Sequence, residues 1–156
     1  MNKIDVVKGF FAAMLGVLTS MFGALAIPII LLVMCNVIDY GTGLVASKFR
    51  GQEISSYRGI QGITKKICMW LLIVVGAIVD ELIVYGVAQM GIVIPFSFMV
   101  ACVVALWLIC NELISILENI KDIGVPLPEF LIKLTKNIKS QIEEKTNVIQ
   151  DEEGEQ

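Results

Sequence analysis

Residues 67–88 decide the fold and read ICMWLLIVVGAIVDELIVYGVA. Asp80 and Glu81 are the only charged residues among them, and the other side chains are mostly apolar. About 20 such residues, rising roughly 1.5 Å each in a helix, cross the hydrocarbon core of a bilayer, which is roughly 30 Å thick. We therefore predict that residues 67–88 form a transmembrane helix.

A second apolar stretch follows directly. Gly91 and Pro95 mark a turn, because both residue types interrupt helices, and residues 95–119 are again long and apolar enough to cross a bilayer. Over the whole chain of 156 residues, 56% are hydrophobic and 17% are charged, whereas ordinary soluble domains have about 25% charged residues. A soluble domain of this size has too little polar surface to cover so many apolar side chains.

A third apolar stretch precedes the first. Residues 9–38 include no charged side chain, and the apolar character continues to Ser47. Such a stretch is too long for one untilted span, and Pro28 near its middle would kink a helix or begin a new one. The prediction is either two spans, residues 7–26 and 28–47, or one long kinked helix.

Basic residues between the apolar stretches set the predicted topology. The loop 48–66 contains a single acidic residue, Glu53, and the basic residues Lys48, Arg50, Arg58, Lys65 and Lys66. By the positive-inside rule this loop is cytoplasmic, and two further spans return the C-terminus to the cytoplasm. Lys3 and Lys8 favour a cytoplasmic N-terminus, which requires an even number of spans. We therefore predict an all-α polytopic membrane protein whose domain 1–124 has four spans, three being the alternative.

The remaining residues, 125–156, are predicted to be cytoplasmic. Gly124, Pro126 and Pro128 end the last span. An apolar stripe at every fourth position, interspersed with lysines, then predicts an amphipathic helix for the membrane surface or a partner helix. The stripe consists of Phe130, Leu134, Ile138 and Ile142, and the lysines are Lys133, Lys136 and Lys139. The acidic end, residues 151–156, is predicted to be disordered.

Polar side chains inside the spans are the candidate functional residues, because a charge at membrane depth is costly and normally faces protein or water. The candidates for a pore lining or a clamp are Asp39, Asp80, Glu112, Ser115, Glu118 and Asn119. Asp39 and Glu112 lie at similar distances from the cytoplasmic ends of their spans, near Lys65 and Lys66. We expect a lysine–carboxylate cluster there, and we interpret it as a structural clamp between helices rather than a transport site.

Small residues recur along the first predicted span at seven-residue intervals. This packing seam consists of Gly9, Gly16 and Gly23, each followed three positions later by Ala12, Thr19 and Ala26. Such a stripe lets two helix backbones approach closely in lipid, which favours oligomerisation or tight hairpin packing. Small residues are also common in membrane helices, so a chance pattern is the alternative.

The composition excludes several kinds of site. The chain has no histidine, so it has neither a Ser-His-Asp or Cys-His catalytic unit nor an HExxH zinc site. A net charge of -3 argues against a nucleic-acid partner. The four cysteines lie in apolar spans and form no CxxC pair, so we expect neither a metal nor a cofactor.

Several short motifs, in this order and at these spacings, resemble the phage-lysis and toxin-secretion holins of Gram-positive bacteria and their phages. They are Asp39-Tyr40-Gly41-Thr42-Gly43, Ser55-Ser56, Gly59-x-x-Gly62-x-x-Lys65-Lys66, Asp80, Glu112-x-x-Ser115-Ile116-Leu117-Glu118-Asn119 and Gly124-x-Pro126-x-Pro128-x-x-Leu131. The resemblance covers roughly residues 30–140.

The resemblance implies a small protein of the bacterial cytoplasmic membrane that is not an enzyme. Such a protein accumulates, oligomerises with itself and permeabilises the bilayer, which lets an endolysin or a large toxin out; an inhibitory antiholin would be a further partner. Two other functions remain open from the residues. One is a small ion- or proton-conducting channel or transporter subunit that uses Asp39, Glu112 and Glu118. The other is a membrane scaffold whose tail recruits a partner.

Overall fold

The computed structural model describes residues 2–52, 55–94 and 98–154, and in these ranges the chain is helical with no strand. The elements, in chain order, are α1 (Lys3–Phe22), the 3-10 turn η1 (Gly23–Leu25), α2 (Ala26–Phe49), α3 (Ser56–Gln89), α4 (Met99–Asp122) and α5 (Glu129–Gly154). The predicted all-α class is therefore confirmed.

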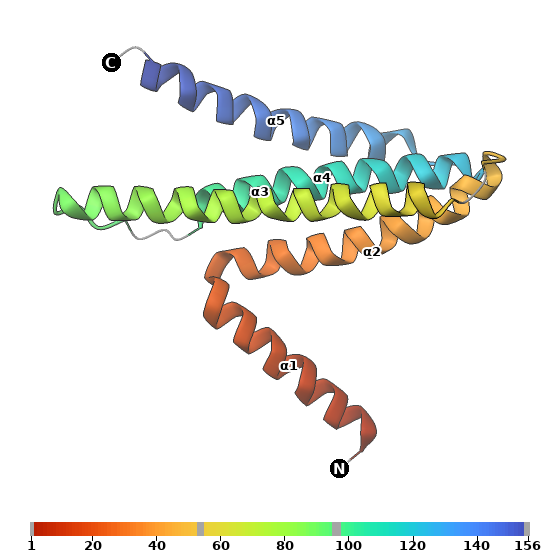
Figure 1. Ribbon diagram of the computed structural model, residues 1–156, viewed down its shortest axis with the longest axis horizontal. Coiled ribbons are helices and arrows are strands. Elements are labelled where there is room, and N and C mark those ends of the chain that lie inside the picture. The colour runs from red at the N-terminus through yellow and green to blue at the C-terminus, as the bar shows by residue number, and fades with distance from the viewer. Residues whose placement is uncertain (1, 53–54, 95–97, 155–156) are drawn as a thin grey trace.

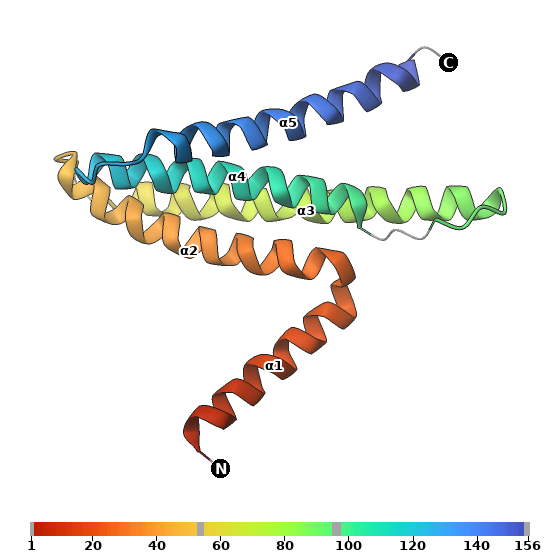
Figure 2. The same cartoon turned by 180° about the vertical axis from the view of Figure 1, so that it is seen from behind.

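Helix α4 is the centre of the molecule, because α2, α3 and α5 each pack against it. Figure 1 shows these helices running side by side, and Figure 2 shows the same arrangement from behind. The α2–α3 and α4–α5 connections lie at one end of the bundle. We call it the basic end, because Lys48, Arg50 and Lys121 lie there.

Apolar side chains fill the space between α2, α3 and α4. Leu32, Ile73, Leu108 and Ala101 are buried in one cluster. Gly76 lets α3 approach α4 closely, since a Cβ at this position would lie 3.0 Å from the Ala101 Cα. Small residues at such contacts allow the close packing that holds membrane helices together. The interior of one copy is therefore packed along this part of the bundle.

Within the described part of the chain, three segments are long and apolar enough to cross a membrane: Gly23–Phe49, Gly59–Gln89 and Met99–Asp122. Only 17–39% of the most apolar window of each segment is buried, so most of these apolar side chains point outward. That exposure suits helices whose solvent is lipid rather than water. The segments correspond to the predicted spans 28–47, 67–88 and 95–119, although residue 95 lies outside the described residues.

The predicted span at residues 7–26 is not among these three segments. Most of it forms α1, which leaves the bundle at η1 and lies apart from α3 and α4 (Figures 1 and 2). The helix breaks at Gly23, whose φ of 50° costs little in a residue without a Cβ. Pro28 instead lies in the first turn of α2, where a missing N–H sacrifices no intrahelical hydrogen bond. Two helices thus replace the single kinked one, and the fourth span stays a prediction.

Helix α3 is longer than its neighbours. Its 34 residues extend about 51 Å, whereas the 24 residues of α2 and of α4 extend about 36 Å each. It begins at Ser56, inside the predicted loop 48–66, so the connection from α2 is shorter than expected. Residues 56–66 are polar and rich in glycine, so hydropathy did not predict that they are helical. At its other end α3 projects past the start of α4 (Figure 1).

Helix α5 runs back along α4 in the opposite direction (Figures 1 and 2). Thr135 is buried there, whereas Phe130, Leu134 and Ile138 of the predicted apolar stripe are exposed. The helix continues to Gly154, into the segment for which the sequence predicts disorder, while residues 155 and 156 lie outside the described ranges. Helix α5 thus packs on α4, but of the predicted apolar stripe only Ile142 is half-buried, so the role predicted for the stripe stays a prediction.

Candidate functional site

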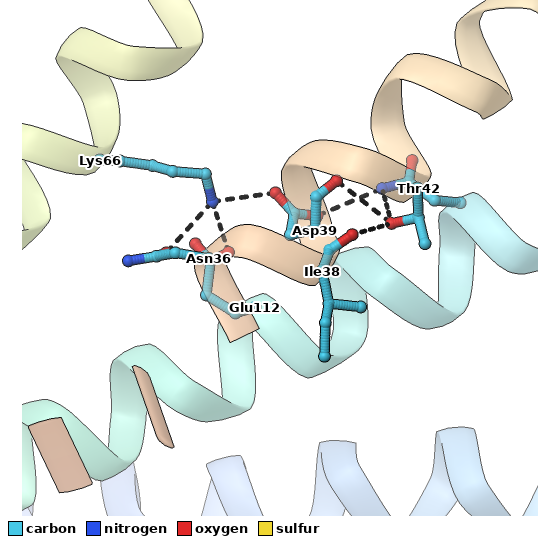
Figure 3. Close-up of polar contacts among 7 residues, drawn as sticks. Asn36, Ile38, Asp39, Thr42, Lys66 and Glu112 are labelled. Carbon is cyan, nitrogen blue, oxygen red and sulfur yellow. Dashed lines mark hydrogen bonds and ion pairs between the residues drawn. The ribbon is translucent and has the colours of Figure 1, made fainter. Parts of the chain in front are cut away.

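The strongest polar site is a cluster of charges that joins three helices. The Lys66 Nζ atom of α3 donates to Asp39 Oδ2 and Asn36 Oδ1 of α2, at 2.9 Å and 3.2 Å, and to Glu112 Oε2 of α4, at 2.5 Å. Figure 3 shows the ammonium group between these three acceptors. We call these four residues the clamp. The Glu112 side chain is only 6% exposed and the Lys66 side chain 20%.

The helices bring the clamp together by simple spacing. Asn36 and Asp39 are three positions apart on α2, so both face the same side of that helix. The sequence predicted a cluster near Lys65 and Lys66 and did not distinguish between the two lysines. In the structure Lys66 belongs to the clamp, whereas Lys65 is exposed. Asn36 was not predicted as a member; its position one helical turn before Asp39 is the signal that could have found it.

The balance of charge in the clamp is one cation against two carboxylates. Separating such groups from water is costly, and hydrogen bonds in the interior offset that cost only when every partner is in place. Among the described residues, no buried side-chain nitrogen or oxygen lacks a hydrogen-bond partner. This arrangement fixes the positions of α2, α3 and α4 along one another, as expected of a structural clamp.

A second network extends from the clamp to the basic end. Asn119 of α4 donates from Nδ2 to Asp39 Oδ1 at 3.2 Å, and its Oδ1 accepts a hydrogen bond from Arg50 Nη2 at 3.1 Å. Arg50 also forms an ion pair with Asp122, with Nε 2.6 Å from Oδ2. The ends of α2 and α4 are thereby held together.

A cavity of about 430 Å³ lies beside the clamp, where α2, α3 and α4 meet near the basic end. Lys66, Asp39 and Asn119 lie on one part of its wall, and Ser47, Ser56 and Ser115 supply hydroxyl groups. The cavity thus extends from the exposed Arg50 and Ser55 to Lys66 and Asp39 of the clamp. The cavity combines charges of both signs, so it offers no uniform field for an ion of one sign.

Asp80 caps a helix other than its own. Its Oδ1 accepts a hydrogen bond from the Val100 backbone N–H at 2.8 Å, and its Oδ2 accepts one from the Ala101 N–H at 2.9 Å. The first N–H groups of a helix have no partner within it and carry positive partial charge, so a buried carboxylate suits this position. Asp80 is 7% exposed, whereas the adjacent Glu81 is exposed. The aspartate therefore fixes where α4 begins relative to α3.

The other predicted candidate residues differ in whether the structure places them near the clamp. Ser115 lines the cavity and Asn119 joins the second network, but Glu118 is exposed and contacts neither. Lys48, Arg50 and Lys65 are exposed at or near the basic end, and the Arg58 side chain lies outside the described residues.

Within the packing seam, Ala26 is buried, whereas Gly9, Ala12, Gly16, Thr19 and Gly23 are exposed. An added Cβ at Gly9 or Gly16 would meet nothing within 4 Å. The described part of the chain thus places no helix against the seam of α1. Tight hairpin packing is not seen in one copy, and oligomerisation stays a prediction.

Comparison with known proteins identifies the family of this chain. A model described as the bacteriophage holin family matches residues 16–140. An uncharacterised 14.9 kDa protein from the nagH 3′ region of Clostridium perfringens is 32% identical over 140 residues, which cover 90% of this chain and 98% of the relative. An uncharacterised Listeria monocytogenes protein is 36% identical over 124 residues, which cover 80% of this chain and 78% of the relative. No solved structure matches the chain.

Proposed function

Because the chain belongs to the bacteriophage holin family, whose members are non-enzymatic membrane proteins, we propose that its copies assemble in the bacterial cytoplasmic membrane and open permeabilising lesions. The lesions release an endolysin or a large toxin from the cell. The family match over residues 16–140 carries this proposal, since it includes all three membrane-capable segments.

The packing of a single copy supports assembly as the route to a lesion. The space between α2, α3 and α4 is occupied by buried side chains such as Leu32 and Leu108. A wide aqueous path must therefore form between copies rather than through one. The exposed seam of α1, with Gly9 and Gly16, provides a surface on which a helix from another copy can pack closely.

The charge distribution supports an orientation. Lys48, Arg50 and Lys121 lie at the basic end, which the positive-inside rule assigns to the cytoplasm. The α4–α5 connection then lies on the cytoplasmic side. Helix α1 runs back from η1 in the direction of the basic end (Figure 1), so as a fourth span it would return the N-terminus to the cytoplasm.

The contacts of the carboxylates favour a lesion over selective conduction. Asp39 and Glu112 hold the same lysine, and the exposed Glu118 contacts neither of them. Carboxylates that conduct ions need to exchange partners, whereas those of the clamp connect helices. In the proposal their role is to keep α2, α3 and α4 together as a unit.

The test is controlled expression of the full chain in bacteria, with membrane potential, leakage of solutes of graded size and release of a co-expressed folded endolysin measured together. A holin collapses the potential and releases the folded enzyme. Loss of potential with release of small ions alone, abolished by Asp39→Asn, would instead identify a selective channel. A full chain that leaves the membrane potential intact and causes no leakage would instead favour a scaffold.

A further inference from the structure

Helix α5 lies against a part of α4 that is far from the basic end. The Trp107 Nε1 atom of α4 donates a hydrogen bond to Glu143 Oε1 of α5 at 2.8 Å, and the Lys139 Nζ atom lies 5.2 Å from the centroid of the Trp107 ring. Trp107 precedes Asp122, the last residue of α4, by 15 positions, or about 22 Å along the helix. A helix confined to the membrane surface could not make these contacts.

The chain reversal that produces this position is built into the α4–α5 connection. Gly124 has a φ of 96°, and its N–H donates to the Lys121 carbonyl at 3.0 Å. The Val125 N–H donates to the Ile120 carbonyl at 3.3 Å. This glycine-centred turn ends α4 and reverses the chain, as in many helix C-termini. Pro126 and Pro128 then prevent α4 from continuing.

The side chains of α5 whose exposure the structure describes, up to Lys145, form three stripes. Leu131, Thr135 and Ile142 are buried or half-buried. Phe130, Leu134 and Ile138 form an apolar stripe that is 43–64% exposed. A polar stripe, also exposed, consists of Lys133, Lys136, Ser140 and Glu144. Beside α4, the helix thus presents a polar face and an apolar face that extends as far as Ile138, beyond which the exposed Gln141 and Lys145 continue the same side.

These faces demand different surroundings at the depth of Trp107. Hydrocarbon suits the apolar stripe but not Lys136 and Glu144, because ionised side chains within a bilayer must face protein or water. Resting on the proposed function, we propose that α5 lines the lesion: it stays beside α4, turns its polar stripe to water and turns its apolar stripe to lipid. In this way α4 and α5 together form the wall unit of each copy.

Spin labels test the position of α5 in vesicles of phosphatidylethanolamine and phosphatidylglycerol. Single cysteines replace Phe130, Leu134 and Ile138 in turn, or Lys136 and Ser140, in a full chain whose native cysteines are changed to alanine. Accessibility to oxygen and to a water-soluble nickel chelate gives the depth and the surroundings of each label, and release of an enclosed dye is measured on the same vesicles.

The proposal expects depth to increase at each step from Phe130 to Leu134 to Ile138, by up to about 6 Å for four helical residues. The labels at Lys136 and Ser140 are accessible to the nickel chelate despite this depth. Equal depth at the three apolar positions would overturn the proposal and leave the proposed function standing, provided that dye is released. Vesicles that retain their dye with the unaltered chain would overturn the proposed function and this inference with it.

A second measurement keeps the native cysteines. Ile138→Lys and Ser140→Lys add the same charge two positions apart, one on the apolar stripe and one on the polar stripe. We expect Ile138→Lys to slow dye release at least tenfold and Ser140→Lys to change it less than twofold. Equal effects of the two substitutions would overturn the assignment of the faces.

Discussion

Lys66 of α3 and Glu112 of α4 form an ion pair, with Nζ 2.5 Å from Oε2, and both lie within membrane-capable segments. The same ammonium group also contacts Asp39 of α2, at 2.9 Å. One lysine is therefore the only described cation that joins all three membrane-capable helices. The stability of the bundle should depend on it more than on any other single charge.

Lys66→Met should destabilise the bundle by about 3–5 kcal/mol, because it leaves two carboxylates in the interior without their cation. Glu112→Gln should cost less, since Asp39 remains as the counterion of Lys66. Unfolding in mixed detergent micelles, followed by circular dichroism, measures both. Lys65→Met is the matched control, because Lys65 is exposed. A Lys65 variant as unstable as the Lys66 variant would contradict the assigned clamp.

Asp80→Ala should cost about 0.5–2 kcal/mol, the range for loss of a helix cap, because it removes the acceptor of the Val100 and Ala101 N–H groups. Glu81→Ala removes an exposed carboxylate one position away and should change stability little. Amide hydrogen exchange at residues 100 and 101 gives a local readout. Exchange there should accelerate in the Asp80 variant alone; equal acceleration in both would exclude the cap.

Gly76→Ala should weaken the contact of α3 with α4 by about 1–3 kcal/mol, because its Cβ would meet the Ala101 backbone at 3.0 Å. Gly86→Ala, on the same helix, meets nothing within 4 Å. It should be neutral or stabilising, by up to about 1 kcal/mol, because alanine favours the helix. Thermal unfolding of the two variants in one detergent compares them directly, and a shared loss would point to a general intolerance of substitution in α3.

Gly16→Leu should reduce self-association if the seam of α1 is the contact between copies, because leucine prevents close approach of two helix backbones. Val17→Leu adds bulk at the next position, which lies outside the seam. Cross-linking in membranes and gel filtration in detergent report the oligomer. We expect a severalfold loss for the Gly16 variant only. Unchanged oligomers in both variants would remove α1 as the contact between copies.

Trp107→Phe should loosen α5 from α4, because phenylalanine lacks the N–H that donates to Glu143. Limited trypsin digestion at Lys136 and Lys139 should become a few times faster. Trp70→Phe in α3 is the control, since the described part of α5 packs mainly on α4. Equal digestion rates for the unaltered chain and the Trp107 variant would show that this hydrogen bond does not hold α5.

Hydropathy and charge placed the three membrane-capable segments well, because a span needs a long run of apolar side chains and little else. The cluster of Lys66 with Asp39 and Glu112 could be predicted from the sequence for a related reason. Few charges lie inside the spans, and helical rise relates sequence position to depth. The ends of the helices were less predictable, since residues 56–66 are helical although polar.

The sequence by itself determined that this chain is a helical membrane protein, where its apolar segments lie and which few charges they contain. Tertiary structure alone decided which lysine joins the clamp, that Asp80 caps α4 rather than facing water, and that α5 lies along α4. The physical reason is that hydropathy is a property of single positions summed along the chain. A hydrogen bond to a backbone N–H or to an indole depends instead on the angle and register of two helices, to which distant residues contribute together.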